Sequence, residues 1–331
     1  MCKKLTILFL LITAICNIST AQIDAHFTQY YANPLWLNPA LTGVFDGDYR
    51  VNSIFRNQKV TTASPILTKG VIADMQLPQH FSLGIMINNQ TSANGGFYYN
   101  NAYLSVGYQI QLSDYQVLSS GFELGVINRG FDPSKLSFGN QYSPITGYDP
   151  TLPSNEIFSK TSSYALDMST GLMYFNGDPY KRLNPFFGMS IYHFNNPSNS
   201  FLTGSSADHV PFRYVVNGGA RINISPILDI TPHLVYIQQG TAREIAAGVY
   251  SSIMVDEEKD FIVGTSYRLQ DAVTANVGLR IKEFFIGLSY DVNISPLRNT
   301  NSYQGAYEIS FSYTHKNTKK ADEPKFVCPR L

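Results

Sequence analysis

The chain has 331 residues, of which 44% are hydrophobic and 13% aromatic, while only 15% are charged. An ordinary soluble domain carries about 25% charged residues, so this chain has too few charges for a surface that meets water on every side. Its 24 basic and 24 acidic residues cancel. This balance excludes the basic surface of a nucleic-acid-binding protein and the high net charge of a disordered chain.

The first 21 residues have the organisation of a secretory signal peptide. Lys3 and Lys4 form a basic start, residues 5–18 form an apolar core, and a run of small residues ends at Ala21. The apolar core is shorter than the ~20 residues that a membrane-spanning helix needs. We therefore expect export of the chain and cleavage after Ala21.

The cysteines limit the chemistry of the mature chain. Cys16 would be the acylated residue of a lipoprotein, but the residue before it, Ile15, is bulky where a small residue is expected. Cleavage after Ala21 removes Cys2 and Cys16 and leaves only Cys328. One cysteine forms neither an intramolecular disulfide nor a cysteine-rich zinc site.

Alternation of apolar and polar residues predicts β-strands along most of the remaining chain. Near the C-terminus, Tyr307, Ile309, Phe311 and Tyr313 share one face, while Ala306, Glu308, Ser310 and Ser312 share the other. The segments are about as long as a tilted membrane-spanning strand, roughly 9 to 11 residues. We count fourteen of them, at about 49–57, 68–77, 80–89, 99–110, 115–128, 161–175, 184–194, 211–222, 227–238, 241–254, 260–269, 272–281, 283–292 and 303–315.

The connections between these segments alternate in length. Tight turns such as 78–79 follow most even-numbered strands, and longer connections such as 129–160 and 195–210 follow most odd-numbered ones. Short periplasmic turns and long surface loops are typical of outer-membrane barrels. A soluble β-sandwich also has alternating strands, but it does not explain this difference between connections. We therefore predict an all-β fold, a transmembrane antiparallel up-and-down β-barrel of about 14 strands over residues 49–315, in the cell outer membrane.

The same alternation places six basic and six acidic residues on the inner face of the barrel. A selective porin has rings dominated by one sign of charge, whereas a balanced set can pair across the interior and hold a plug. Simple filling of a hydrated lumen explains the charges equally well. We expect little open conductance. The candidate lumen charges are Arg50, Arg56, Asp74, Glu123, Asp167, Arg213, Arg221, Glu244, Arg268, Arg280, Asp291 and Glu308.

Residues 22–48, which we call the strap, are predicted to be neither strand nor linker. Two Asn-Pro pairs lie five residues apart here, and proline moves the residue before it away from helical geometry, so each pair favours a turn. We expect a compact plug that inserts into the barrel or covers its periplasmic mouth; an ordered loop that only packs is the alternative. The candidate residues of the motif are Tyr30, Asn33, Pro34, Trp36, Asn38, Pro39, Ala40 and Gly43.

Three stretches carry a resemblance to a known family. Residues 30–43, with both Asn-Pro pairs, resemble the N-terminal signature of the PorP/SprF family, outer-membrane proteins of the type IX secretion system in Bacteroidota. Residues 185–200 resemble the family's mid-chain strand and loop, and residues 305–310 followed by 328–330 resemble its end. The resemblance implies a role in export or surface retention of a cargo protein, in some organisms a gliding adhesin. It also implies partners in the periplasmic machinery, including a peptidoglycan-associated protein.

The polar tail, residues 316–331, would emerge in the periplasm if the barrel has the predicted orientation. A periplasmic partner could bind it there, although a frayed terminus explains its composition equally well. The candidate partner residues are Lys316, Lys319, Lys320, Cys328 and Arg330.

The sequence contains little that indicates catalysis. Its six histidines are scattered, without a pair at metal-ligand spacing, so we expect no enzyme activity, metal or cofactor. Two alternatives to a secretion component remain open. Asn38-Pro39-Ala40 also resembles the plug motif of long-chain fatty-acid transporters, which implies a channel for hydrophobic small molecules. The loop at 129–160 could instead serve a surface adhesin.

Overall fold

The computed structural model describes residues 24–58, 65–158, 160–198, 209–256, 258–295 and 305–316. The predicted signal peptide lies outside these residues, as does the tail beyond Lys316. Within them, no helix has both the length and the apolar character needed to span a bilayer.

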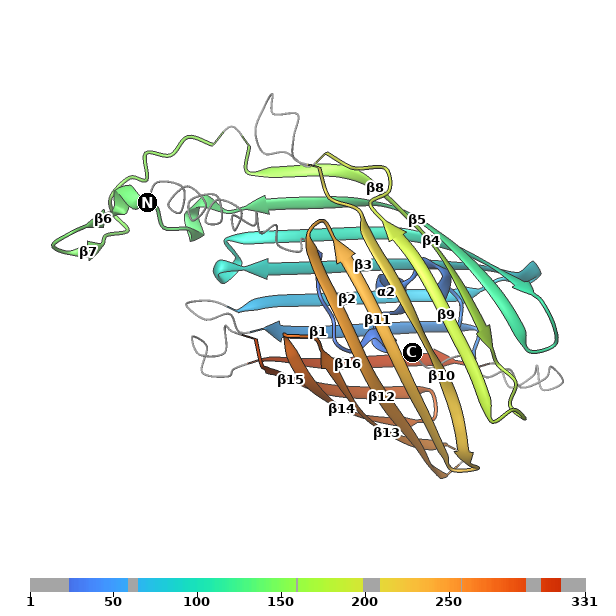
Figure 1. The fold of residues 1–331 in the computed structure, drawn as a ribbon. Helices are drawn as coiled ribbons and strands as arrows, with labels where there is room; N and C mark the ends of the chain where they lie inside the picture. The colour runs from blue at the N-terminus through green and yellow to red at the C-terminus, as the bar shows by residue number, and fades with distance from the viewer. Residues whose placement is uncertain are drawn as a thin grey trace, which may run out of the picture.

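Fourteen antiparallel strands form one closed barrel (Figure 1). The ring closes where the first strand pairs with the last: Tyr49 lies opposite His315, and Gln58 opposite Ala306. Closure leaves no strand edge unpaired, which a bilayer without water requires. The predicted fold class and strand number are confirmed. The strands are β1 Tyr49–Gln58, β2 Ile66–Gln76, β3 Phe81–Ser92, β4 Phe97–Gln111, β5 Gln116–Phe131, β8 Ser162–Asn176, β9 Leu183–Tyr192, β10 Arg213–Ser225, β11 Leu228–Gln239, β12 Ala242–Asp256, β13 Lys259–Arg268, β14 Ala272–Ile281, β15 Phe284–Asn293 and β16 Ala306–His315.

The outer face of the barrel is apolar and has an aromatic girdle at each end. Along β15, residues alternate strictly between exposed and buried, and the exposed ones include Phe284, Ile286 and Leu288. Exposed aromatic side chains mark the two ends of this band, as in other transmembrane barrels. Tyr49, Phe81 and Tyr108 lie at one end, and Tyr214, Tyr267 and Tyr290 at the other.

The two ends of the barrel also differ in their connections. The end at which β16 finishes carries mostly short turns, and the opposite end carries the long loops. We call these the turn end and the loop end. Because periplasmic turns are short in outer-membrane barrels, we expect the turn end to face the periplasm. The loop after β5 begins at residue 132 rather than the expected 129, because Gly130 still pairs with Ser162. This loop carries a small hairpin of β6 Tyr142–Ser143 and β7 Gly147–Tyr148.

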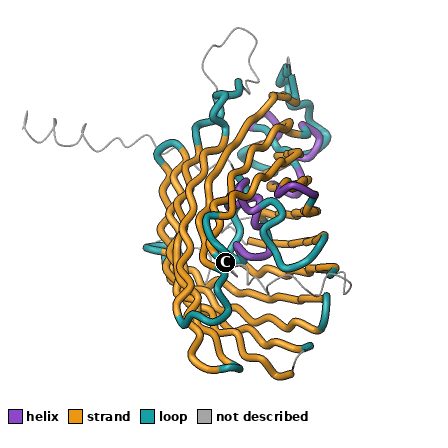
Figure 2. The backbone as a smooth tube through the Cα atoms, turned by 90° about the vertical axis from the view of Figure 1, so that its right-hand side faces the viewer, coloured by secondary structure: helices purple, strands orange, loops and turns teal. Residues whose placement is uncertain are grey.

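The described part of the strap, residues 24–48, lies inside the barrel rather than across its mouth. Figure 1 shows its blue trace within the ring of strands, and Figure 2 shows the strand wall curving around short helices. Proline begins two of its helical turns, α2 Pro34–Leu37 and η2 Pro39–Leu41, as expected for the first helical position. The Asn38 side chain caps η2 by accepting a 2.9 Å hydrogen bond from the backbone N–H of Ala40. A further turn is η1 Tyr30–Ala32.

Candidate functional site

The strap crosses the lumen from the loop end to the turn end. At the loop end, Asp24 contacts His193 directly after β9 and Tyr99 at the start of β4, at 2.9 and 3.1 Å. At the turn end, the backbone N–H of Gly43 donates to Asp74 at 2.8 Å, and Gln76 donates to the Phe45 carbonyl at 2.9 Å. The strap therefore occupies the whole length of the barrel interior.

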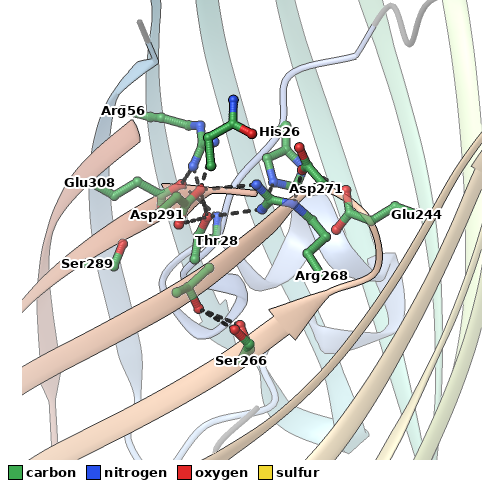
Figure 3. A network of polar contacts seen from close by, with 12 residues as sticks. His26, Thr28, Arg56, Glu244, Ser266, Arg268, Asp271, Ser289, Asp291 and Glu308 are labelled. Atoms are coloured by element: carbon green, nitrogen blue, oxygen red, sulfur yellow. Dashed lines mark hydrogen bonds and ion pairs between the residues drawn. The ribbon is translucent and has the colours of Figure 1, made fainter. Parts of the chain in front are cut away.

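A cluster of buried charges holds the strap at Thr28 and Gln29, near its described start (Figure 3). Arg56 on β1 forms ion pairs with Glu308 on β16 at 2.7 Å and with Asp291 on β15 at 3.0 Å. The backbone N–H groups of Thr28 and Gln29 donate to the two carboxylate oxygens of Glu308 at 2.6 and 2.8 Å. The Thr28 hydroxyl donates to Asp291 at 2.9 Å. Wall charges thus bind both the strap backbone, at Thr28 and Gln29, and the Thr28 hydroxyl.

A second group of contacts joins the strap to β12 and β13. His26 lies 3.0 Å from Glu244, and the Tyr30 hydroxyl donates to the same carboxylate at 3.0 Å. Arg268 lies beside His26 and forms an ion pair with Asp291 at 3.2 Å. This arginine therefore links the two groups into one network around the strap (Figure 3).

A third cluster surrounds His193 at the loop end. Its two ring nitrogens contact carboxylates, Nδ1 with Asp167 at 2.7 Å and Nε2 with Asp24 at 2.9 Å. Burial disfavours the imidazolium, but the charge of Asp24 and the hydrogen bonds that the ring donates to both carboxylates outweigh this effect and raise the pKa of His193 to about 10. Burial likewise opposes ionisation of Asp24, yet His193 and Arg213 hold its pKa well below the usual value. His193 is therefore a buried cation shared by the strap and the wall.

Arg213 on β10 contacts Trp36, the only tryptophan of the chain. Its guanidinium lies over the Trp36 ring at 4.0 Å and over the Tyr192 ring at 4.6 Å. The same group donates to the Trp36 carbonyl at 3.2 Å. Cation–π contacts of this kind strengthen when they are removed from water, and Trp36 is buried.

Close backbone contact fixes the second Asn-Pro pair against the wall. Asn38 donates to the Leu172 carbonyl of β8 at 3.0 Å, and the Ser119 hydroxyl donates to the Ala40 carbonyl at 2.7 Å. A Cβ atom on Gly121 would lie 2.2 Å from the carbonyl carbon of Pro39. The wall must therefore carry glycine where the strap lies against it. Gly43 has φ +71°, a conformation that glycine adopts without strain.

Most of the proposed lumen charges meet the strap or its partners. Arg280 pairs with Asp260 at 3.6 Å in a partly exposed position. Glu123 is fully buried, and neither of its carboxylate oxygens has a hydrogen-bond partner among the described residues. Arg221 is buried on β10. Arg50 completes the set by pairing with Asp74 at 2.7 Å.

Other site residues were not anticipated from the sequence. His26 and His193 are 167 positions apart, and neither was among the candidate site residues. His26 joins the strap to the wall residue Glu244, and His193 lies between Asp24 of the strap and Asp167 of the wall. The amide of Asn33, a motif residue, is buried without a partner among the described residues. Of the candidate tail residues, Lys316 pairs with Asp46 at 2.8 Å. Lys319, Lys320, Cys328 and Arg330 lie outside the described residues.

No group of three or more His, Cys, Asp or Glu side chains in the described part of the chain could hold a metal ion. The clusters instead pair acids with bases around the strap.

The comparison with protein families decides the identity. A model described as "Type IX secretion system membrane protein PorP/SprF" matches residues 19–313. The chain belongs to the PorP/SprF family. As a member, it is a membrane component of the type IX secretion system, and its barrel places it in the outer membrane. No curated protein matches it.

Two solved structures illustrate the fold. The toluene transporter TbuX of Ralstonia pickettii is 12% identical, with a TM-score of 0.51, over 85% of this chain and 93% of its own. The toluene transporter TodX of Pseudomonas putida is 8% identical, with a TM-score of 0.50, over 88% and 97%. At this identity the likeness concerns the barrel architecture alone.

Proposed function

We propose that this PorP/SprF protein is a non-catalytic docking component that assists the export or surface retention of a cargo protein. The strap carries the proposal, because it fills the lumen and is tied to the wall by the buried ion pairs of His26 with Glu244 and of Asp24 with His193. Removing one partner from a buried pair costs about 3–5 kcal/mol. A barrel closed in this way works through the surfaces at its two ends rather than through its interior.

The turn end is the proposed site for the periplasmic machinery. Lys316, the first residue of the tail, pairs with Asp46 at the end of the strap, and both side chains are more than half exposed. A partner that binds the tail, including a peptidoglycan-associated protein, would therefore also meet the base of the strap. The loop end, with residues 132–161, is the proposed site for the cargo, which in a gliding organism would be an adhesin.

Affinity purification from native outer membranes tests this proposal. A tagged full-length chain should recover secretion-machinery proteins and a large exported protein by mass spectrometry. A chain that ends at Lys316 should lose the machinery proteins while its barrel still assembles. Replacing Lys259, at the start of β13, and Lys282, in the connection between β14 and β15, with glutamine controls for the loss of positive charge at the turn end.

The opposite result would favour the alternative function, a channel for hydrophobic small molecules like the fatty-acid transporters. Recovery of lipid without machinery proteins would contradict the docking role. The charged and strap-filled lumen argues against such a channel, since it offers no continuous apolar route.

A further inference from the structure

Three asparagines lie side by side on the neighbouring strands β3, β4 and β5 (Figure 1). In the strand register Asn89 lies opposite Asn100, and Asn100 lies opposite Asn128. Their side chains are hydrogen-bonded in the same order: Asn89 donates to Asn100 at 2.6 Å, and Asn100 donates to Asn128 at 3.2 Å. Asn128 in turn donates to the Ser163 carbonyl of β8 at 3.2 Å. We call these three residues the asparagine row.

The asparagine row is on the outer face of the barrel. The residues next to it in the chain that point into the lumen are buried, namely Asn88, Asn101 and Ile127. Because successive side chains of a strand point to opposite faces, the row shares its face with the exposed Ile87 and Val126. The amides therefore interrupt a surface that is otherwise apolar.

The height of the row matches the edge of the lipid-facing band. Asn89 lies eight residues beyond Phe81, which belongs to the aromatic girdle at the turn end. At ~3.4 Å per residue this is roughly 27 Å along the strand, and the tilt of the strands reduces it to about 20 Å of height. An outward apolar band is ~25 Å tall in such barrels. The row thus lies near the level at which acyl chains give way to headgroups at the loop end.

A cation and an aromatic ring flank the row. Lys69 on β2 lies opposite Asn89, is exposed on the same outer face, and forms no ion pair with another described residue. Tyr164 on β8 lies opposite Asn128 at the other end of the row, and its side chain is 70% exposed. One continuous register across five strands therefore presents a positive charge, three amides and a ring.

Another part of the wall is apolar where it reaches the loop end. On β13, β14 and β15 the corresponding outward residues are Tyr267, Val273 and Val292, which lie opposite one another in the register and are exposed. A strand of this barrel can therefore meet the headgroup level without an amide. The polar row on β3, β4 and β5 is a local feature that calls for a local explanation.

The unused hydrogen-bonding groups of the row define the chemistry of a ligand. An amide side chain has two N–H donors and two acceptor lone pairs, and the contacts within the row leave each amide with at least one of both. Hydroxyl groups, which donate and accept, suit such a surface. An ammonium group such as that of Lys69 binds phosphate as a point charge. Exposed apolar residues directly below the row, among them Val71 and Ile87, contact acyl chains.

We propose that the asparagine row, together with Lys69 and Tyr164, binds the headgroup of a phosphorylated glycolipid in the leaflet at the loop end. Lys69 binds the phosphate, the amides bind sugar hydroxyls, and the Tyr164 ring packs against a sugar face. The acyl chains lie along the apolar wall below. This lipid site is on the outside of the barrel, so it is separate from the strap and from the proposed docking surfaces at the two ends.

Native mass spectrometry of the full-length protein in detergent tests the proposal by counting bound lipid. The probe is monophosphoryl lipid A, which has a phosphate, sugar hydroxyls and acyl chains. The control lipid is phosphatidylglycerol, which has a phosphate and acyl chains but no sugar. We expect one retained lipid A, bound at least tenfold more tightly than phosphatidylglycerol. Equal affinity for the two lipids, or no retained lipid A, would overturn the proposal.

Matched variants show whether the row is the site. Lys69→Gln and Asn100→Leu should each weaken lipid A binding about fivefold or more, because each loses a polar contact with the headgroup. Arg243→Gln and Gln238→Leu are the controls, since these residues lie opposite each other on the outer face of β12 and β11 at the same end, and they should leave the affinity unchanged. Heat-dependent gel mobility verifies that each barrel is folded. Wild-type affinity in both folded row variants, or an equal loss in the controls, would also overturn the proposal.

Discussion

Asp24 and His193 form a buried 2.9 Å ion pair at the loop end of the barrel, although 169 residues separate them in the chain. Asp24 is the first described residue of the strap, and His193 is the first residue after β9. The strap therefore begins at the loop end and joins β1 at the turn end. The described part of the strap, residues 24–48, is threaded through the barrel, so substitutions at its buried contacts test how the plug is held.

Alkaline pH should loosen this end of the strap. The pKa of His193 is raised from 6.5 to about 10. Its stabilising contribution is therefore fully present below pH 6.5 and is lost as pH rises toward 10, because the unfolded histidine releases its proton first. The apparent melting temperature should fall across this window. It should fall less in His193→Gln, and parallel profiles for the two proteins would contradict this assignment.

Loss of the buried Arg56 guanidinium should destabilise the barrel. In Arg56→Met, Asp291 and Glu308 lose a buried partner, at a cost of about 3–5 kcal/mol. Arg280→Gln is the matched control, since its pair with Asp260 is partly exposed and is worth about 1 kcal/mol or less. The loss of stability in each variant is measured by unfolding it in urea and monitoring the folded fraction by gel mobility. Equal effects would show that the network around the strap contributes no special stability.

A wall glycine should be required for strap contact. Gly121→Ala places a methyl group against the backbone of Pro39, and such overpacking costs about 1–3 kcal/mol. We expect the strap to shift and Trp36 emission to move to longer wavelength. Gly139→Ala has no atom within 4 Å of the new Cβ and should leave both stability and emission unchanged.

The strap should block the passage of ions. Purified full-length protein in planar bilayers should show little steady current, whereas deletion of residues 24–44 should open the lumen and raise conductance at least tenfold. Large steady currents from the intact protein would contradict the plugged state. Arg56→Met provides an intermediate test, since a loosened strap should produce flickering openings.

The sequence by itself determined the strands, the closed barrel and the inward direction of residues such as Arg56 and Glu308. A strand alternates with period two, so each residue is assigned to a face from its neighbours alone. The tertiary structure decided which inward groups meet, because contacts across the lumen depend on strand stagger and on the path of the strap. Thr28 and Glu308 are 280 positions apart in the chain, and His193 and Asp24 are 169 apart, so no local pattern relates them. The interrupted pairing of β10 with β11 at Pro232 appeared for the same reason, because the effect of a missing N–H depends on the strand that lies beside it.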